Sequence, residues 1–269
     1  MIDLESPDET RTPGKLLESR VDQDPASRPL HPAETLDALR PAGLKIIQAK
    51  RGYRFSLDPV LLCAFAQVAK GEMVADLGTG SGVVPLLLAA RTGAKKIVGV
   101  EIQPELADRA RRSVLLNCLQ DRIDILECDL RELQGSLEPQ AFEVVIANPP
   151  FRRPGTGRQA PINERAAARH ELAGGLIDFL RAATYLLKDG GRFYIVFLAE
   201  RLAELLAGMR ELLLEPKRLR CVHSRAGERG TLVLVEGRKG GRAGLAMEPP
   251  LLVYEGEAYS AEILAIYGG

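Results

Sequence analysis

The stretch Asp76-Leu77-Gly78-Thr79-Gly80-Ser81-Gly82 decides the fold. It lies between a short apolar run at 73–77 and a longer apolar run that starts at Val83 and has the length of a helix. Glycines at a strand-to-helix turn let a ligand approach the backbone closely, and the first turn of the helix supplies free N–H groups. The stretch therefore predicts a ligand site at the end of a strand.

The pattern around this loop repeats as strand, turn and helix. Strands are expected at 73–77, 97–101, 123–126, 144–147 and 192–198, and helices at 83–92, 104–119, 166–187 and from 199 to about 214. Such alternation predicts an α/β fold with a mostly parallel sheet and helices on both faces. Segments 217–223 and 231–237 have no helix between them, so we expect them to form an antiparallel pair at a sheet edge.

Composition excludes several classes of protein. The chain has 269 residues with 36 basic and 36 acidic side chains, so it is not a globally basic nucleic-acid binder. No secretory signal is recognisable, and the longest apolar run, 83–90, is far shorter than the ~20 residues that a membrane helix needs. The four cysteines form no CxxC pair. We expect a cytoplasmic protein, favour a monomer, and expect neither a metal site nor a membrane partner.

Four parts of the chain are expected. Residues 1–34 hold five prolines and eight acids, which predicts a disordered acidic tail of net charge −4. Residues 35–70 are predicted to form a cap segment, a hairpin followed by a helix with Asp58 as N-cap and Pro59 as its first residue. Residues 71–240 are expected to form the domain that carries the glycine loop, and 241–269 a C-terminal extension packed on it.

Two acids indicate which ligand the loop takes. Asp76 lies at the end of the first strand, and Val83 stands where a dinucleotide fingerprint has Gly or Ala. A carboxylate at this place repels a pyrophosphate but attracts an ammonium or sulfonium group. Glu101 ends the second strand, a position from which an acid accepts hydrogen bonds from ribose hydroxyls. The pattern favours a cationic nucleoside ligand over NAD or ATP. The glycines alone are equally compatible with a plain connection.

Asn148-Pro149-Pro150-Phe151 directly follows an apolar strand, at the sheet edge where open α/β sheets bind ligands. The Asn148 side-chain oxygen and the Pro149 carbonyl can accept the two hydrogens of an NH2 group, which localises the nitrogen lone pair for attack on a methyl group. Pro149 and Pro150 stiffen the loop, and Phe151 offers a face on which a planar base can stack. The alternative is a simple turn after a strand.

Three basic segments accompany this pattern although the whole chain is neutral. Residues 45–54, 151–170 and 217–242 have net charges of +4, +4 and +6. Single basic loops are usually solvated, whereas three around one pocket predict a track for a polyanion. Tyr53 and Phe55 either stack an extruded base or belong to a small core. The candidate RNA contacts are Arg51, Tyr53, Arg54, Phe55, Arg152, Arg153, Arg158, Arg165 and Arg169.

The order of these motifs resembles that of the class I S-adenosylmethionine (SAM)-dependent methyltransferases, with D-L-G-T-G-S-G as first motif and Glu101 as the ribose-binding acid. The resemblance implies SAM as cofactor and a Rossmann-like, seven-stranded, mostly parallel sheet with an antiparallel edge strand. It implies that Asp129 lies near the adenine amino group of SAM; taken alone, Asp129 is read as a helix N-cap or a solvated residue. The implied cofactor contacts are Asp76, Gly78, Thr79, Gly80, Gly82, Glu101, Ile102, Asp129, Leu130 and Asn148.

The N-P-P-F tetrapeptide is similar to the (N/D)-P-P-(Y/F/W) motif of amino-methyltransferases that act on adenine N6, guanine N2 or a glutamine amide. Further matches are T-L-D-A-L at 35–39, R-G-Y-R-F-S-L-D at 51–58, R-P-G-T-G-R at 153–158 and A-R-H-E at 168–171. As a set, over about residues 35–240, they resemble the bacterial tRNA1(Val) adenine-N6 methyltransferase family.

This resemblance implies methyl transfer to adenine N6 in a tRNA anticodon loop, where splaying out a base costs least. It implies that 51–58 closes over the site and that 152–170 contacts the RNA. Guanine-N2 methylation of ribosomal RNA, protein glutamine methylation and a non-catalytic RNA-binding module remain open.

Overall fold

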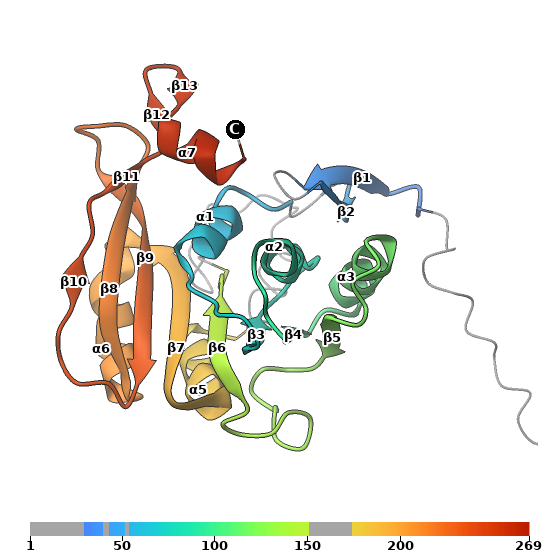
Figure 1. Cartoon of the computed structure of the whole chain (residues 1–269), viewed down its shortest axis with the longest axis horizontal. Coiled ribbons are helices and arrows are strands. Elements are labelled where there is room, and N and C mark those ends of the chain that lie inside the picture. Colours follow the sequence, from blue (N-terminus) through green and yellow to red (C-terminus); the bar gives the residue numbers. More distant parts are fainter. Residues whose placement is uncertain (1–29, 40–42, 52–53, 151–173, 269) are drawn as a thin grey trace, which may run out of the picture.

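The computed structural model describes residues 30–39, 43–51, 54–150 and 174–268 (Figure 1). The predicted tail up to residue 29 and the basic segment that starts at Phe151 lie outside these residues. Within the described part, a nine-stranded sheet has the order β10-β8-β9-β7-β6-β3-β4-β5, and β11 also pairs with β8. The strands are β3 (Met73–Leu77), β4 (Lys96–Glu101), β5 (Ile123–Glu127), β6 (Phe142–Ala147), β7 (Leu187–Leu198), β8 (Leu214–His223), β9 (Gly230–Lys239), β10 (Ala246–Met247) and β11 (Leu251–Leu252).

The expected parallel core of the sheet is confirmed. Strands β7, β6, β3, β4 and β5 pair in parallel in that order. Consecutive residues of a strand point to opposite faces, so Val74 packs into one apolar cluster and its neighbour Ala75 into the other. Because both faces are covered, the strands are apolar almost throughout, as their sequences predicted.

The place of the antiparallel strand differs from the expectation. β9 lies between β7 and β8 and pairs antiparallel with both, so it is an interior strand. The short turn after β8 forces β9 to run back beside it, and β8 therefore runs parallel to β7. Residues 246–247 and 251–252 then add β10 and β11 in parallel outside β8, which explains why the sheet has more than the expected seven strands.

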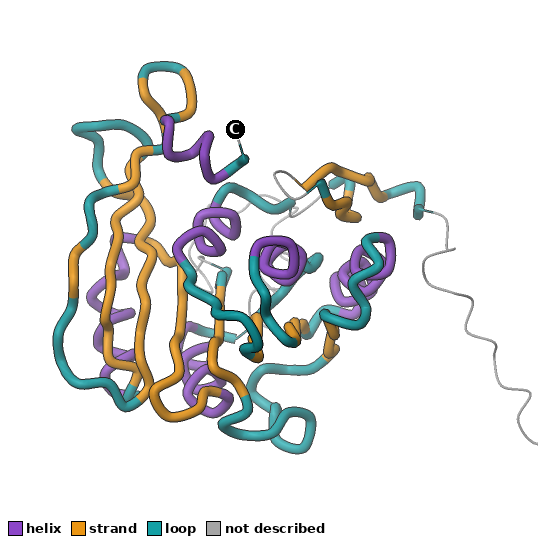
Figure 2. The backbone as a smooth tube through the Cα atoms, viewed as in Figure 1, coloured by secondary structure: helices purple, strands orange, loops and turns teal. Residues whose placement is uncertain are grey.

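Helices lie on both sides of the sheet (Figure 2). They are α1 (Asp58–Phe65), α2 (Val83–Arg91), α3 (Pro104–Leu116), α5 (Leu176–Leu186), the short 3-10 turn η2 (Ala199–Arg201), α6 (Leu202–Glu211) and α7 (Ala261–Ile266). Residues of α1, α2, α3 and α7 contribute to one core cluster, and residues of α5 and α6 to the other. Helices therefore cover both faces, as expected.

Some helix ends differ from those expected. Leu57 is the N-cap of α1, and Asp58 is its first residue rather than its cap. α3 stops at Leu116 because Cys118 adopts a left-handed conformation with φ of 54°. α5 ends at Leu186, and the glycines at 190 and 191, expected in a turn, belong to β7.

An N-terminal hairpin of β1 (Glu34–Leu39) and β2 (Leu44–Ala49) docks on α3. Ile47 N donates to Ser113 Oγ at 3.0 Å, one of the backbone contacts that fix it. Glu34, expected in a solvated tail, is instead the first residue of β1 and only 7% exposed. Its carboxylate accepts hydrogen bonds from Arg112 at 2.8 and 2.6 Å, and these bonds lower the pKa of Glu34 to about 2.

The C-terminal extension contacts the rest of the domain at several points. A small hairpin of β12 (Tyr254–Glu255) and β13 (Ala258–Tyr259) precedes α7, whose Ile263 is fully buried (Figure 1). Glu262 accepts two hydrogen bonds from Arg220 at 2.6 and 2.7 Å. None of the helices in the described residues combines the length and apolarity needed to cross a membrane.

Candidate functional site

The glycine loop between β3 and α2 is fastened to β4. Gly78 N and Thr79 N both donate to the Val100 carbonyl, at 2.9 and 3.0 Å. Gly80 N donates to Glu101 Oε2 at 2.8 Å. Positive φ values of 70°, 60° and 87° occur at Gly78, Gly80 and Gly82. The glycines are needed because side chains strain this conformation, and the loop they allow turns its backbone toward β4.

Asp76 and Thr79 present unsatisfied polar atoms inside this loop. Asp76 is 1% and Thr79 6% exposed. Asp76 Oδ2 and Thr79 Oγ1 are the two buried side-chain polar atoms that lack a hydrogen-bond partner within the described residues. Burial raises the pKa of Asp76 to about 7, with a further contribution from Glu101 and an opposing one from the Thr79 hydroxyl. Such orphaned atoms are costly unless a ligand completes them, so they fit a cationic, hydrogen-bonding cofactor.

Glu101 holds the glycine loop and can still accept further hydrogen bonds. Its Oε1 accepts from Gln103 N at 2.9 Å, while Oε2 accepts from Gly80 N. Burial raises the pKa of this carboxyl group. Each carboxylate oxygen has a second acceptor direction, so Glu101 can hold the loop and still accept hydrogen bonds from vicinal hydroxyls. Ile102, the adjoining candidate contact, is half-buried.

Asp129 lies beside this acid, because Cys128 N donates to the Glu101 carbonyl at 3.0 Å. Its carboxylate accepts from Arg131 N at 2.9 Å and from the Arg131 guanidinium at 2.9 and 2.5 Å. These bonds lower the pKa of Asp129 and keep it ionised. Leu130 is 8% exposed and packs into a core cluster. Asp129 thus lies next to Glu101 at the end of β5, with Arg131 as its partner.

Asn148 follows β6 at the same edge of the sheet. β6 pairs with β3 in a register that sets Ala147 against Leu77, so Asn148 and Gly78 are the next residues of two adjacent strands. Asn148 and Pro150 are half-buried and Pro149 is buried. Phe151 lies outside the described residues. The strand pairing therefore brings Asn148 next to the start of the glycine loop.

Two residues that support the loop were not among the candidates. A Cβ added at Gly78 would lie 3.2 Å from the ring of Phe179, which α5 places under the loop. A Cβ at Gly99, in β4, would lie 2.8 Å from Thr79 Oγ1. A glycine inside an apolar strand marks a close approach by another group, so Gly99 carried a usable signal. Nothing in the sequence placed Phe179 there.

The described RNA candidates are partly engaged within the cap segment. Arg54 donates to Asp37 at 2.6 Å and to Thr35 at 3.1 Å. Phe55 N donates to Gln48 Oε1 at 3.0 Å, and its side chain packs against a core cluster. These contacts anchor 54–55 to the hairpin, while Arg51 is exposed. Tyr53, Arg152, Arg153, Arg158, Arg165 and Arg169 lie outside the described residues.

Much of the basic charge of 217–242 is used internally. Arg218 pairs with Glu236 at 2.6 Å and with Glu248 at 3.2 Å, and Arg220 pairs with Glu262. Lys239 Nζ donates to two backbone carbonyls at 2.8 and 2.7 Å. The expectation of a free cationic track is therefore wrong for these three side chains, because acids and carbonyls distant in the sequence already compensate them.

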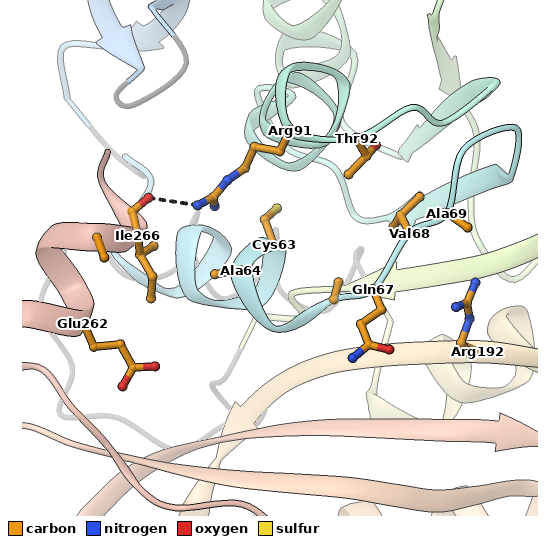
Figure 3. Close-up of a pocket in the computed structure, with 12 residues that line it drawn as sticks. Cys63, Ala64, Gln67, Val68, Ala69, Arg91, Thr92, Arg192, Glu262 and Ile266 are labelled. Carbon is orange, nitrogen blue, oxygen red and sulfur yellow. Dashed lines mark hydrogen bonds between the residues drawn. The ribbon is translucent and has the colours of Figure 1, made fainter. Parts of the chain in front are cut away.

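A cavity of about 700 Å³ lies elsewhere, between α1, the end of α2 and α7 (Figure 3). Arg91 crosses it to donate to the Ile266 carbonyl at 2.9 Å, and Cys63 lies in its wall. Arg91 is the last residue of α2 and Thr92 its C-cap, whereas the glycine loop leads into the start of this helix. The cavity is thus separate from the loop. No cluster of potential metal ligands occurs in the part of the chain that the structure describes.

Comparisons with known proteins identify methyltransferases as similar to this chain. The methyltransferase small domain family matches residues 58–215. The tRNA1(Val) (adenine(37)-N6)-methyltransferase of Porphyromonas gingivalis is 35% identical over 161 residues, 56% of this chain and 61% of that protein. The protein of the same name from Aeromonas hydrophila is 30% identical over 186 residues, 68% of this chain and 75% of that protein. The chain thus spans about three-fifths of the Porphyromonas relative's length.

Solved structures share the fold. A predicted O-methyltransferase, protein Atu636 from Agrobacterium tumefaciens, is similar with a TM-score of 0.65 and 25% identity, covering 78% of this chain and 95% of that chain. TYW2 of P. horikoshii in complex with MeSAdo has a TM-score of 0.54 at 17% identity, covering 78% and 72% of the two chains. At that identity the second similarity shows the fold alone.

Proposed function

Because the chain belongs to the methyltransferase small domain family and, within it, to the tRNA1(Val) (adenine(37)-N6)-methyltransferases, we propose that it methylates adenine N6 in a tRNA anticodon loop. SAM is the proposed methyl donor. One observation carries the proposal: the unpaired atoms of Asp76 and Thr79 lie at the same sheet edge as Asn148, one strand away. A cofactor-binding residue pair and an amine-orienting side chain thus share one site.

The described residues fit SAM as the cofactor. Asp76, Thr79 and Glu101 would hold its polar groups, with the backbone of Gly78, Gly80 and Gly82 in the loop and Ile102, Asp129 and Leu130 beside them. The Asp76 carboxylate matches a cation, and the Glu101 carboxylate matches ribose hydroxyls. When bound, SAM supplies a methyl group on a positively charged sulfur.

Asn148 and Pro149 prepare the nucleophile. An exocyclic amine is a weak nucleophile because its lone pair is delocalised into the ring. The Asn148 side-chain oxygen and the Pro149 carbonyl accept the two N–H hydrogens and draw the lone pair onto nitrogen. Pro149 and Pro150 preorganise these acceptors, and such fixed dipoles account for large shares of enzymatic rates. The amine loses a proton after it has become cationic, so no base is needed before the attack.

Adenine in tRNA is the proposed substrate because relatives at 30–35% identity carry that name. Phe151 would stack on the base, and Arg152, Arg153, Arg158, Arg165 and Arg169 would contact the RNA backbone. Arg51, Tyr53, Arg54 and Phe55 would border the same site. We further propose a monomeric protein that acts in the cytoplasm, where its RNA substrate is found.

Identification of the methylated nucleoside tests the proposal directly. The protein is incubated with labelled SAM and separated cellular RNAs, and the labelled nucleoside is analysed. We expect N6-methyladenine in tRNA. An N2-methylguanine product in ribosomal RNA, label in protein, or RNA binding without SAM binding would each overturn the proposal in favour of a different function.

Asn148→Ala tests the role of the amide. Removing one preorganised polar group of this kind lowers turnover by about 100-fold or more. The Kd for RNA should stay within about twofold of the wild-type value. Asn148→Asp is the matched control, because a carboxylate oxygen can still accept the N–H hydrogen that the amide oxygen accepts, so this variant should keep more activity than Ala. A large loss of RNA affinity in Asn148→Ala would contradict the assigned role.

A further inference from the structure

The last three residues of β4 determine how the glycine loop lies. Val100 supplies the carbonyl that accepts from Gly78 N and Thr79 N, and Glu101 supplies the carboxylate that accepts from Gly80 N. Gly99 precedes them and pairs in register with Asp76 of β3 and with Ile125 of β5. A glycine therefore stands in the sheet directly beside the buried carboxylate.

The Thr79 side chain occupies the space that a side chain at position 99 would take. A Cβ at position 99 would lie 2.8 Å from Thr79 Oγ1 and 2.9 Å from Thr79 Cγ2, closer than real Cβ atoms approach. The third neighbour, Ile125 Cδ1 at 3.0 Å, is the end of a flexible side chain and can move. The Thr79 side chain thus rests on the bare backbone of β4.

Rotation of Thr79 would not relieve such a contact. A threonine fills two of the three staggered positions on its Cβ. Both γ atoms of Thr79 face Gly99, so two of the three staggered positions point toward Gly99 and one points away. Any other rotamer moves one γ atom to the third position and leaves the other γ atom facing Gly99. A methyl group at position 99 would therefore push the loop itself away from β4, against the hydrogen bonds to Val100.

We infer that Gly99 is a positioning residue for the cofactor, because its empty side-chain position seats Thr79 and so holds Thr79 Oγ1 and Asp76 Oδ2 together in the site. Both atoms are buried, and neither makes a hydrogen bond of regular geometry within the described residues, so a bound group can complete them. The inference rests on the proposed use of SAM. It adds a residue that touches neither cofactor nor substrate.

A double-mutant cycle tests this inference by calorimetric SAM binding. Gly99→Ala should raise the Kd for SAM by about tenfold or more. Thr79→Ala removes both γ atoms and should weaken binding only by the loss of the hydroxyl. In the Thr79→Ala background, Gly99→Ala should change the Kd by less than about twofold, because the clash is gone.

Two further readouts separate positioning from general damage. In the unliganded protein, Gly99→Ala should lower the unfolding temperature and Thr79→Ala should restore it, although Ala is ordinarily preferred to Gly inside a strand. In turnover, Gly99→Ala should raise the KM for SAM more than it lowers kcat. The matched control is Gly237→Ala in β9, whose Cβ would meet the flexible end of Met209 at 2.4 Å. It should leave the Kd for SAM unchanged.

Two results would overturn the inference while the proposed function stands: wild-type affinity in Gly99→Ala, or an undiminished penalty in the Thr79→Ala background. A wild-type protein that does not bind SAM would instead overturn the proposed function, and with it the cofactor role of Gly99. The unfolding temperatures would still report whether Thr79 packs on position 99.

Discussion

The affinity for SAM should depend on pH through Asp76. In the free protein, burial and the neighbouring Glu101 raise the pKa of Asp76 to about 7, so the carboxyl group is mostly protonated at pH 6 and mostly ionised at pH 8. A cationic cofactor binds the ionised form. Binding should therefore tighten as the pH rises and should release a proton below pH 7.

The size of the effect follows from the titration. If only the ionised form binds, the apparent Kd is its limiting value divided by the ionised fraction. With a pKa of about 7, that fraction is about a tenth at pH 6 and nine-tenths at pH 8, so the Kd should fall about tenfold.

Ionisation of Asp76 also lowers the folding stability of the protein without bound SAM. The pKa is raised on folding, so the stabilising contribution of protonated Asp76 is complete below its unfolded pKa and is lost as the pH rises through about 7. Between pH 6 and pH 8 the free energy of unfolding should fall by about 1.4 kcal/mol. A raised SAM affinity and a lowered stability should thus appear together.

Isothermal titration calorimetry at several pH values, in buffers of different ionisation enthalpy, measures both the Kd and the protons released. Asp76→Asn should bind SAM weakly and without this pH dependence. The other titratable groups near Asp76 are Glu101 on β4 and Cys63 on α1. A Kd that is constant between pH 6 and pH 8, or a pH dependence that persists in Asp76→Asn, would refute the reasoning.

Two further predictions concern charge. Glu34→Gln removes the buried acid that pairs with Arg112, which keeps the half-exposed Asp108 as a partner, and should lower the free energy of unfolding in urea by about 3 kcal/mol. Asp124→Asn, which removes an exposed partner of Lys96, should cost under about 1 kcal/mol. Because the pKa of Glu34 is lowered to about 2, its contribution should be lost only as the pH falls from about 4.5 toward 2; equal losses in the two variants would contradict this account. Replacing Arg152 and Arg153 with Ala should reduce the slope of log Kd for RNA against log salt by up to about 2 with SAM affinity unchanged, and an unaltered slope would rule out their contact with the RNA backbone.

Local patterns were sufficient for the centre of the fold. Apolar runs bounded by turn residues were enough to predict the parallel strands β3, β4, β5, β6 and β7. The glycine loop was enough to predict where β3 ends. Asp76, Glu101 and Asn148 could be assigned to one edge because carboxyl ends of parallel strands meet there. These features depend on residues close together in the sequence.

Features that depend on distant residues were not predictable. The interior place of β9 depends on whether β9 or β8 pairs with the free edge of β7, and nothing within 230–239 encodes that choice. Glu34 reads as one more acid of a tail until Arg112, 78 residues away, is seen beside it. Arg218 and Arg220 likewise read as free cations until their acidic partners are brought near.

The hairpin that docks on α3 also sets where this protein can be shortened. The family match begins at residue 58, after both strands of the hairpin, whereas the buried ion pair that fastens it begins at Glu34. A fragment cut at residue 58 would expose the α3 surface that the hairpin covers and would remove Glu34 from Arg112. We therefore expect the smallest autonomously folding unit to start at residue 34 or before, so that a fragment limited to the family match should not be stable.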